Sequence, residues 1–143
     1  MATEAKLAEF VAAQDAVYDE VRRELAAGLK ETHWIWFIFP QLAGLGQSSI
    51  SRKFALASQA EARRFWEHPV LGPRLRECTQ LLLASPKRSI AAILGDPDDL
   101  KFRSSMTLFA AAAPEEPIFK EALKKFFDGA PDPLTLELLH KPD

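Results

Sequence analysis

The stretch His-Trp-Ile-Trp-Phe-Ile-Phe-Pro-Gln, residues 33–41, contains two of the chain's three tryptophans and six consecutive large apolar side chains, residues 34–39. Six such side chains in a row cannot all face water without forming an exposed apolar patch, so most of them must be buried. Short apolar runs fit a helix or a strand, and the secondary structure of this one stays open. We therefore expect a core element whose polar ends face a functional site.

Outside this stretch the apolar residues recur at the spacing of amphipathic helices. Leu71, Leu75, Cys78 and Leu82 follow an i, i+4, i+7, i+11 pattern, which places them on one helix face. We find sustained strand-like alternation in no segment. The sequence predicts an all-α fold, a compact single-domain bundle of about six to eight short helices, with Cys78 as a buried thiol. We expect one domain over residues 1–143.

Capping residues mark where several helices begin. Ser58 with Glu61 three residues later forms a capping box, and Asp132-Pro133 joins an N-cap to a proline at the first helical position. Asp96-Pro97 repeats the second pattern. We also expect Asp15 to be an N-cap, because aspartate accepts hydrogen bonds from the first free N–H groups of a helix.

Composition and charge exclude several classes of function. The 143 residues are 48% hydrophobic and 27% charged, with a formal net charge of -2, so we expect no nucleic-acid partner. No apolar stretch approaches the roughly 18 residues that span a membrane, and residues 1–7 lack the layout of a secretion signal. The single cysteine excludes an internal disulfide. We expect a soluble, cytoplasmic monomer or homodimer with no membrane partner.

The aromatic stretch supplies the first candidate site residues. Histidine titrates near neutral pH, so His33 is a candidate for proton transfer, although it could equally bond to the backbone or to a carboxylate. Trp34 and Trp36 could stack on the flat ring of a nucleotide, or pack in the core.

The loop after this stretch has the composition of an anion-binding turn. Its candidate ligand residues are Gln41, Gly44, Gly46 and Ser48. Glycines adopt the left-handed conformations that allow consecutive N–H groups to face an anion. The loop lacks the lysine of a phosphate-binding Walker loop and the spacing of a dinucleotide fingerprint, and an ordinary tight turn explains it equally well.

The helix expected after Asp96-Pro97 carries polar residues among apolar ones. Its polar candidates are Lys101, Ser104, Ser105 and Thr107. The apolar residues around them predict a buried helix. A buried amine and buried hydroxyls need partners, and a bound ligand is one source of them. Asp132 and Thr135, late in the chain, could complete such a site.

The sequence gives little support for a metal site or for covalent catalysis. His33, His68 and His140 are isolated and Cys78 stands alone, so ligand spacing is absent and we expect no metal and no cofactor. Lys101 precedes its serines, the reverse of the S-x-x-K order of serine–lysine enzymes. The candidate catalytic residues are His33, Lys101 and Asp132.

Motifs along almost the whole chain match those of one bacterial family. They are residues 13–15 with Tyr18, residues 33–41, 44–46, 68–72 and 104–109, and Asp132 with residues 135–136. On these residues the chain resembles the family of domain of unknown function 1810, some members of which have been mislabelled calpastatin. The resemblance implies a compact, mostly helical single domain without an established activity.

At a greater distance the chain is similar to the NAD- and ADP-ribose-associated glycosidases. The likeness lies in the late pair Lys101-Phe102 and in a terminal helix with Asp132, Thr135 and Leu136. A likeness at this level concerns the fold, and a function still has to be argued from a site.

Two functions remain open. In the first, residues 33–49 and the helix with Lys101 form a concave site for a small anionic, nucleotide-like ligand, a derivative of NAD or ADP-ribose, whose N-glycosidic bond could be hydrolysed. In the alternative, the aromatic stretch of a non-enzymatic helical module anchors a partner protein or a second copy. A ligand site requires Trp34 or Trp36 to line a cleft, whereas an interaction module requires one of them to protrude.

Overall fold

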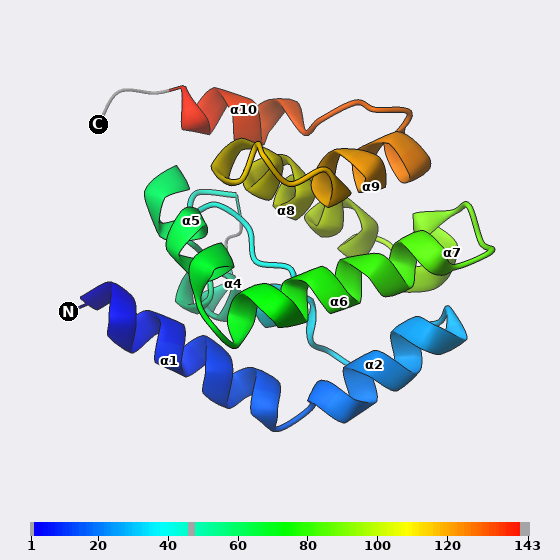
Figure 1. The fold of residues 1–143 in the computed structure, drawn as a ribbon, viewed down its shortest axis with the longest axis horizontal. Helices are drawn as coiled ribbons and strands as arrows, with labels where there is room; N and C mark the ends of the chain where they lie inside the picture. The colour runs from blue at the N-terminus through cyan, green and yellow to red at the C-terminus, as the bar shows by residue number, and fades with distance from the viewer. Residues whose placement is uncertain (1, 46–47, 141–143) are drawn as a thin grey trace.

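The structure, a computed structural model, describes residues 2–45 and 48–140, and this part of the chain contains ten helices joined by turns and loops (Figure 1). Seven of them have seven or more residues, which confirms the expected all-α bundle. They are α1 (Ala2–Asp15), α2 (Tyr18–Ala27), α5 (Gln59–Glu67), α6 (Leu71–Ala84), α8 (Asp98–Ala112), α9 (Ile118–Phe127) and α10 (Pro133–Leu139). The three short ones are α3 (Ile35–Ile38), α4 (Ser49–Lys53) and α7 (Ile90–Leu94).

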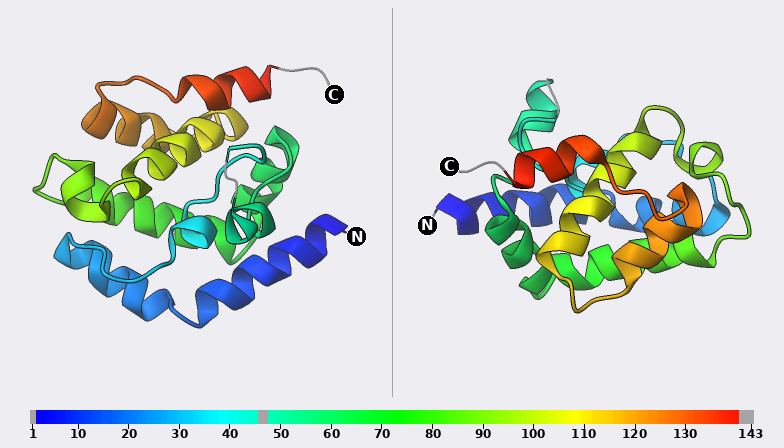
Figure 2. Two further views of the ribbon diagram at one scale, coloured as in Figure 1. Left: turned by 180° about the vertical axis from the view of Figure 1, so that it is seen from behind. Right: turned by 90° about the horizontal axis from the view of Figure 1, so that it is seen from above.

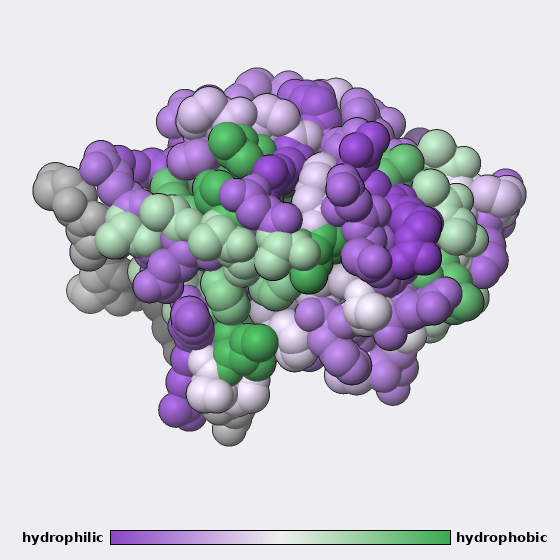
Figure 3. Space-filling view, turned by 90° about the horizontal axis from the view of Figure 1, so that it is seen from below, coloured by the Kyte–Doolittle hydropathy of each residue, from purple (hydrophilic) through white to green (hydrophobic). Residues whose placement is uncertain are grey.

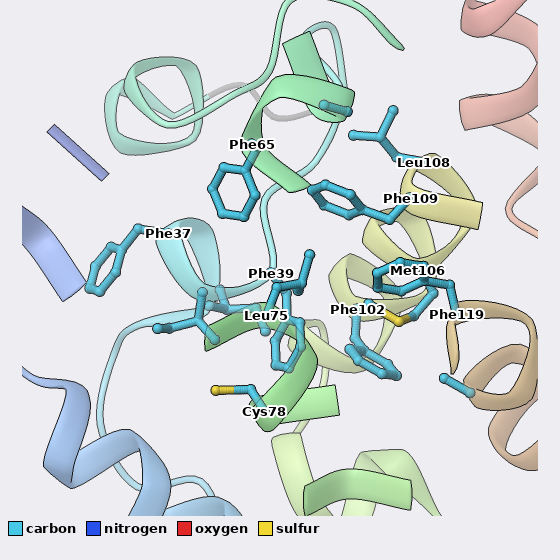
Figure 4. Close-up of a cluster of buried hydrophobic side chains, with 14 of the residues drawn as sticks. Phe37, Phe39, Phe65, Leu75, Cys78, Phe102, Met106, Leu108, Phe109 and Phe119 are labelled. Carbon is cyan, nitrogen blue, oxygen red and sulfur yellow. The ribbon is translucent and has the colours of Figure 1, made fainter. Parts of the chain in front are cut away.

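The aromatic stretch forms one helical turn followed by extended chain. Within the stretch, only the residues of α3 are helical. Residues 39–41 lead from α3 to an isolated parallel bridge between Leu42 and Leu56. Burial of the stretch is confirmed, with Trp36 the one partly exposed side chain in residues 34–40. The ring centroid of Phe39 lies 4.9 Å from that of Phe102 on α8 (Figure 4). This contact ties the stretch to the centre of the core.

The core surrounds α8, as expected from the apolar character of that helix. It packs against α3, α5, α7, α9 and α10, and residues 104–109 are all buried. Figure 2 shows α1 and α2 along one edge of the molecule and α10 at the opposite edge. Cys78 on α6 is buried as predicted, and burial raises the pKa of its thiol to about 12.

The surface beside α1 and α2 is shown in Figure 3, where a band of weakly hydrophobic residues crosses a largely hydrophilic face. Alanines on α1, such as Ala5, Ala8 and Ala12, are exposed. Within residues 2–45 and 48–140, every helix is too short or too polar to cross a membrane.

Two of the four predicted caps are confirmed. Ser58 Oγ accepts the N–H of Glu61 at 3.1 Å, and Asp132 Oδ2 accepts the N–H of Thr135 at 3.0 Å. The Glu61 carboxylate reaches back to the N–H of Ala57, at 2.9 Å, one residue before the cap. Both caps fix the start of a helix, α5 and α10.

The other two expected caps were wrong. Asp15 is the last residue of α1 rather than a cap of α2, because α1 extends over fourteen residues and its Asp15 carboxylate instead accepts Arg74 at 2.7 Å. Asp96 is exposed, and α8 begins two residues later at Asp98. The N–H of Asp99 donates to the carbonyl of Gly95 at 2.9 Å, which satisfies a group that a capping side chain would otherwise serve.

Candidate functional site

Two tryptophan–lysine pairs share one carboxylate, that of Asp98. Lys30 Nζ lies 2.8 Å from Asp98 Oδ2 and 5.1 Å from the ring centroid of Trp34. Lys101 Nζ lies 3.5 Å from Asp98 Oδ1 and 5.0 Å from the ring centroid of Trp36. We call these five residues the two-lysine cluster. It joins the loop before α3, α3 itself and the first turn of α8.

Local sequence explains how the cluster is assembled. Gly28 ends α2 with a φ of 73°, a left-handed conformation that glycine adopts without strain. The chain then turns toward α7, where the N–H of Lys30 donates to the carbonyl of Ile93 at 2.7 Å. On α8, Asp98 and Lys101 are three residues apart and therefore lie on the same face.

The Trp34 side of the cluster is closed by a buried carboxylate, Glu24 on α2. Glu24 Oε1 accepts the indole N–H of Trp34 at 2.9 Å and the backbone N–H groups of Glu31 and Thr32 at 2.7 and 3.0 Å. Its Oε2 accepts the Thr32 hydroxyl at 2.6 Å. Burial raises the pKa of Glu24, but these hydrogen bonds outweigh it and hold the pKa at about 2. Trp34 is 1% exposed and has a structural role.

The Trp36 side of the cluster is less buried, because Trp36 is partly exposed and the Lys101 side chain is 25% exposed. The indole Nε1 of Trp36 is buried and has no hydrogen-bond partner within residues 2–45 and 48–140. Ser105 Oγ is likewise buried and unpartnered in that part of the chain, and Ser105 itself is 0% exposed. Ser105 lies one turn after Lys101, so the two residues are on the same side of α8.

Four further predicted residues form a separate, closed network between α8 and α10. Asp132 Oδ2 accepts the hydroxyls of Ser104 and Thr135 at 3.2 and 2.5 Å, and the N–H of Asp132 donates to Thr107 Oγ1 at 2.8 Å. The hydroxyls of Ser104 and Thr107 also donate to the carbonyls four residues earlier on α8. These contacts attach α10 to α8, and they occupy the carboxylate that we considered for catalysis.

The remaining predicted residues lie elsewhere. His33 is exposed, the backbone carbonyl of Gln41 accepts the N–H of Leu56 at 2.9 Å, and Ser48 is the N-cap of α4, accepting the N–H of Ser51 at 3.1 Å. Gly44 has a φ of 102° and packs beside Leu138 of α10. Gly46 lies outside the described residues. None of these contacts joins the loop to the two-lysine cluster.

Sequence reasoning missed Lys30, Asp98 and Glu24 as parts of this region. Asp98 carries a usable signal, because an acid three residues before Lys101 on an expected helix must lie beside it. Lys30 and Glu24 carry none, since they reach the site only through the turn that follows α2.

Neither tryptophan of the aromatic stretch protrudes from the surface. Trp34 is buried, and Trp36 is partly buried with the Lys101 ammonium over its ring. A protruding anchor is what the interaction-module alternative requires, so the fold offers that alternative no support. Four hollows of about 290–630 Å³ in the described part of the chain are lined by neither tryptophan, so the cleft that the ligand hypothesis requires is not shown either. Among the described residues, no group of three or more His, Cys, Asp or Glu is placed to hold a metal ion.

Comparison with known proteins identifies the family. A family model described as a protein of unknown function (DUF1810) matches residues 4–139. The chain belongs to this family. A crystal structure described as the conserved hypothetical protein Rv1873 from Mycobacterium tuberculosis is similar to it, with 47% sequence identity and a TM-score of 0.93 over 95% of this chain and 97% of that one. A search of curated proteins gave no match. The similar crystal structure supports the helical fold, and the DUF1810 description states no function, so a function has to be argued from the site.

Proposed function

We propose that the Trp36 side of the two-lysine cluster binds a small anionic ligand. The observation that carries this proposal is the buried indole N–H of Trp36, which has no acceptor among the described residues and lies beside the Lys101 ammonium. Leaving a buried polar group without a partner costs about 1–3 kcal/mol. An oxygen of an anionic ligand would accept this N–H and remove that cost.

Charge supports an anion at this position. Lys30 and Lys101 supply two ammonium groups and Asp98 one carboxylate, which gives the cluster a net charge of +1. The Lys30–Asp98 contact is short and nearly buried, with Lys30 6% exposed at its side chain, whereas the Lys101–Asp98 contact is long and Lys101 is 25% exposed. Lys101 is therefore the less tightly paired and more exposed of the two cations, and the one that a ligand can reach, while Lys30 keeps Asp98 in place.

A nucleotide-like ligand, such as an ADP-ribose or NAD derivative, fits the chemistry of these groups. The oxygens of a phosphate would accept hydrogen bonds from the Lys101 ammonium and from the indole N–H of Trp36. Hydrogen bonds to an ionised group are stronger than those between neutral groups. Aromatic rings attract planar bases, and the Trp36 ring is the partly exposed aromatic surface of the cluster.

The proposal is one of binding rather than of turnover. Hydrolysis of an N-glycosidic bond needs a group free to transfer a proton or to stabilise the departing sugar. Asp132 is occupied by the α8–α10 network, Asp98 is ion-paired, and His33 makes no contact with the cluster among the described hydrogen bonds and ion pairs. The family assignment gives no activity to set against this argument.

Thermal unfolding with ADP-ribose, NAD and pyrophosphate tests the proposal. A ligand at 100 times its Kd stabilises the fold by about 2.7 kcal/mol, which raises Tm by on the order of 8 °C for a chain of this size. We expect this shift in the parent protein and its loss in Lys101→Met. The matched control is Lys53→Met, which removes a lysine at the end of α4 whose ammonium lies 5.4 Å from the ring centroid of Phe54.

Two results would contradict the proposal. One is the absence of any Tm shift at millimolar ligand. The other is an equal shift in the parent protein, Lys101→Met and Lys53→Met, which would place the binding elsewhere.

A further inference from the structure

A hollow lies between α8, α9 and α10, about three turns along α8 from Lys101 of the two-lysine cluster. It is a cavity of about 630 Å³ with an apolar floor. The floor consists of Ala110 and Ala111 of α8, Leu123 of α9 and Leu136 of α10. We call it the α8–α10 groove. Its volume falls within the roughly 300–1,000 Å³ typical of small-molecule sites.

Small side chains and a fixed helix explain why the groove exists. Ala110 and Ala111 follow a run of larger buried residues on α8, so the helix surface recedes at this point. The network of Ser104, Thr107 and Asp132 fixes the start of α10 against α8 just before the groove. The hollow is therefore a built feature of the helix arrangement.

Two lysines on α9 line the wall of the groove. Lys120 and Lys124 are one helical turn apart and exposed, and neither makes a hydrogen bond or an ion pair within the described parts of the chain. Like charges at this spacing repel each other. Asp128 is the one acidic residue that lines the groove, so its charged side chains sum to +1.

The neighbouring Lys125 shows what a structural lysine on the same helix does. Its Nζ donates to the carbonyls of Leu83 and Ser85 at 2.8 and 2.6 Å and caps the end of α6. Lys120 and Lys124 make no such hydrogen bonds to a helix end within the described residues.

From this geometry we infer that the α8–α10 groove binds a small amphipathic anion. The apolar body of the ligand lies on the alanine and leucine floor, and its carboxylate or phosphate meets Lys120 and Lys124. The charge of the lysine pair selects an anion over a neutral or cationic amphiphile of the same size. This site is independent of the two-lysine cluster.

Titration of the full chain with decanoate below its micelle concentration tests the inference, read out by calorimetry and by ¹H–¹⁵N NMR. We expect shifts of the amide signals of Ala110, Ala111, Leu123 and Leu136, and weaker or no binding of decyltrimethylammonium. The double variant Lys120→Gln/Lys124→Gln is expected to weaken decanoate binding by about five- to twentyfold, since each exposed charge contributes up to about 1 kcal/mol. Ala111→Leu, which fills the floor, is expected to abolish binding.

Lys53→Gln is the matched surface control and should leave the Kd unchanged. The inference is overturned if decanoate moves none of the groove signals, if the cation binds as tightly as the anion, or if the double lysine variant binds decanoate like the parent protein. The double variant changes exposed side chains alone, so this test does not depend on whether Ala111→Leu folds.

Discussion

Trp34 and Trp36 lie two residues apart in the same aromatic stretch, and each has a lysine ammonium about 5 Å from its ring. They differ in what their indole N–H groups meet. That of Trp34 donates to Glu24, whereas that of Trp36 is buried without a partner among the described residues. Residue type and the neighbouring lysine are therefore the same for the two rings, whereas their burial and the hydrogen bonding of their N–H groups differ, and our proposal rests on the second difference.

The largest expected effect is on the closed side, from Glu24→Gln. The pKa of this carboxyl falls from an ordinary 4.5 to about 2 in the folded protein, a difference worth about 3 kcal/mol of stability at neutral pH. Because the folded pKa is depressed, that stability is present above pH 4.5 and is lost as the pH falls toward 2. Glutamine resembles the protonated acid, so urea unfolding should find the variant about 3 kcal/mol less stable at pH 7 and nearly equal to the parent protein at pH 2.

The other carboxylates titrate alike in Glu24→Gln and in the parent protein, so their contribution cancels when the free energies of unfolding of the two proteins are subtracted at each pH. A difference of under about 1 kcal/mol at pH 7, or one that does not change with pH, would show that Glu24 does not organise the Trp34 side.

A smaller effect is expected from replacing each tryptophan by phenylalanine. Trp34→Phe removes a hydrogen bond to a buried charge and leaves a gap in the core, and we expect a loss of about 2–3 kcal/mol in the free energy of unfolding. Trp36→Phe also loses contact area, but it removes a buried N–H that has no partner among the described residues. The second effect partly offsets the first, so the free energy of unfolding should change by less than about 1 kcal/mol. Denaturant unfolding of both variants measures the two values side by side, and equal losses would remove the distinction between the two sides.

Sequence reasoning succeeded where the physics is local. Ser58 and Asp132 were predicted as caps because a capping side chain reaches an N–H within three residues. The burial of the aromatic stretch followed from its apolar surface. That Lys101 and Ser105 lie on the same side of a helix could be predicted from the helix period alone.

The sequence failed where distant residues compete for a group. Asp15 has the chemistry of a cap, but Arg74, 59 residues away, takes its carboxylate. Asp132, Ser104, Thr107 and Thr135 were grouped with Lys101 because all are polar residues on or near one buried helix. The structure divides them: four satisfy one another, whereas the Lys101 ammonium lies over the ring of Trp36.

The most direct test of the account is a ¹H–¹⁵N NMR titration that follows the three tryptophan indole N–H signals while ADP-ribose is added. If ADP-ribose binds at Trp36, we expect the Trp36 signal to move progressively and to saturate, and Lys101→Met to abolish this movement. The Trp34 signal should stay in place, because its N–H donates to Glu24. A Trp36 signal that stays still at millimolar ADP-ribose, or one that moves no more than those of Trp34 and Trp66, would contradict the account.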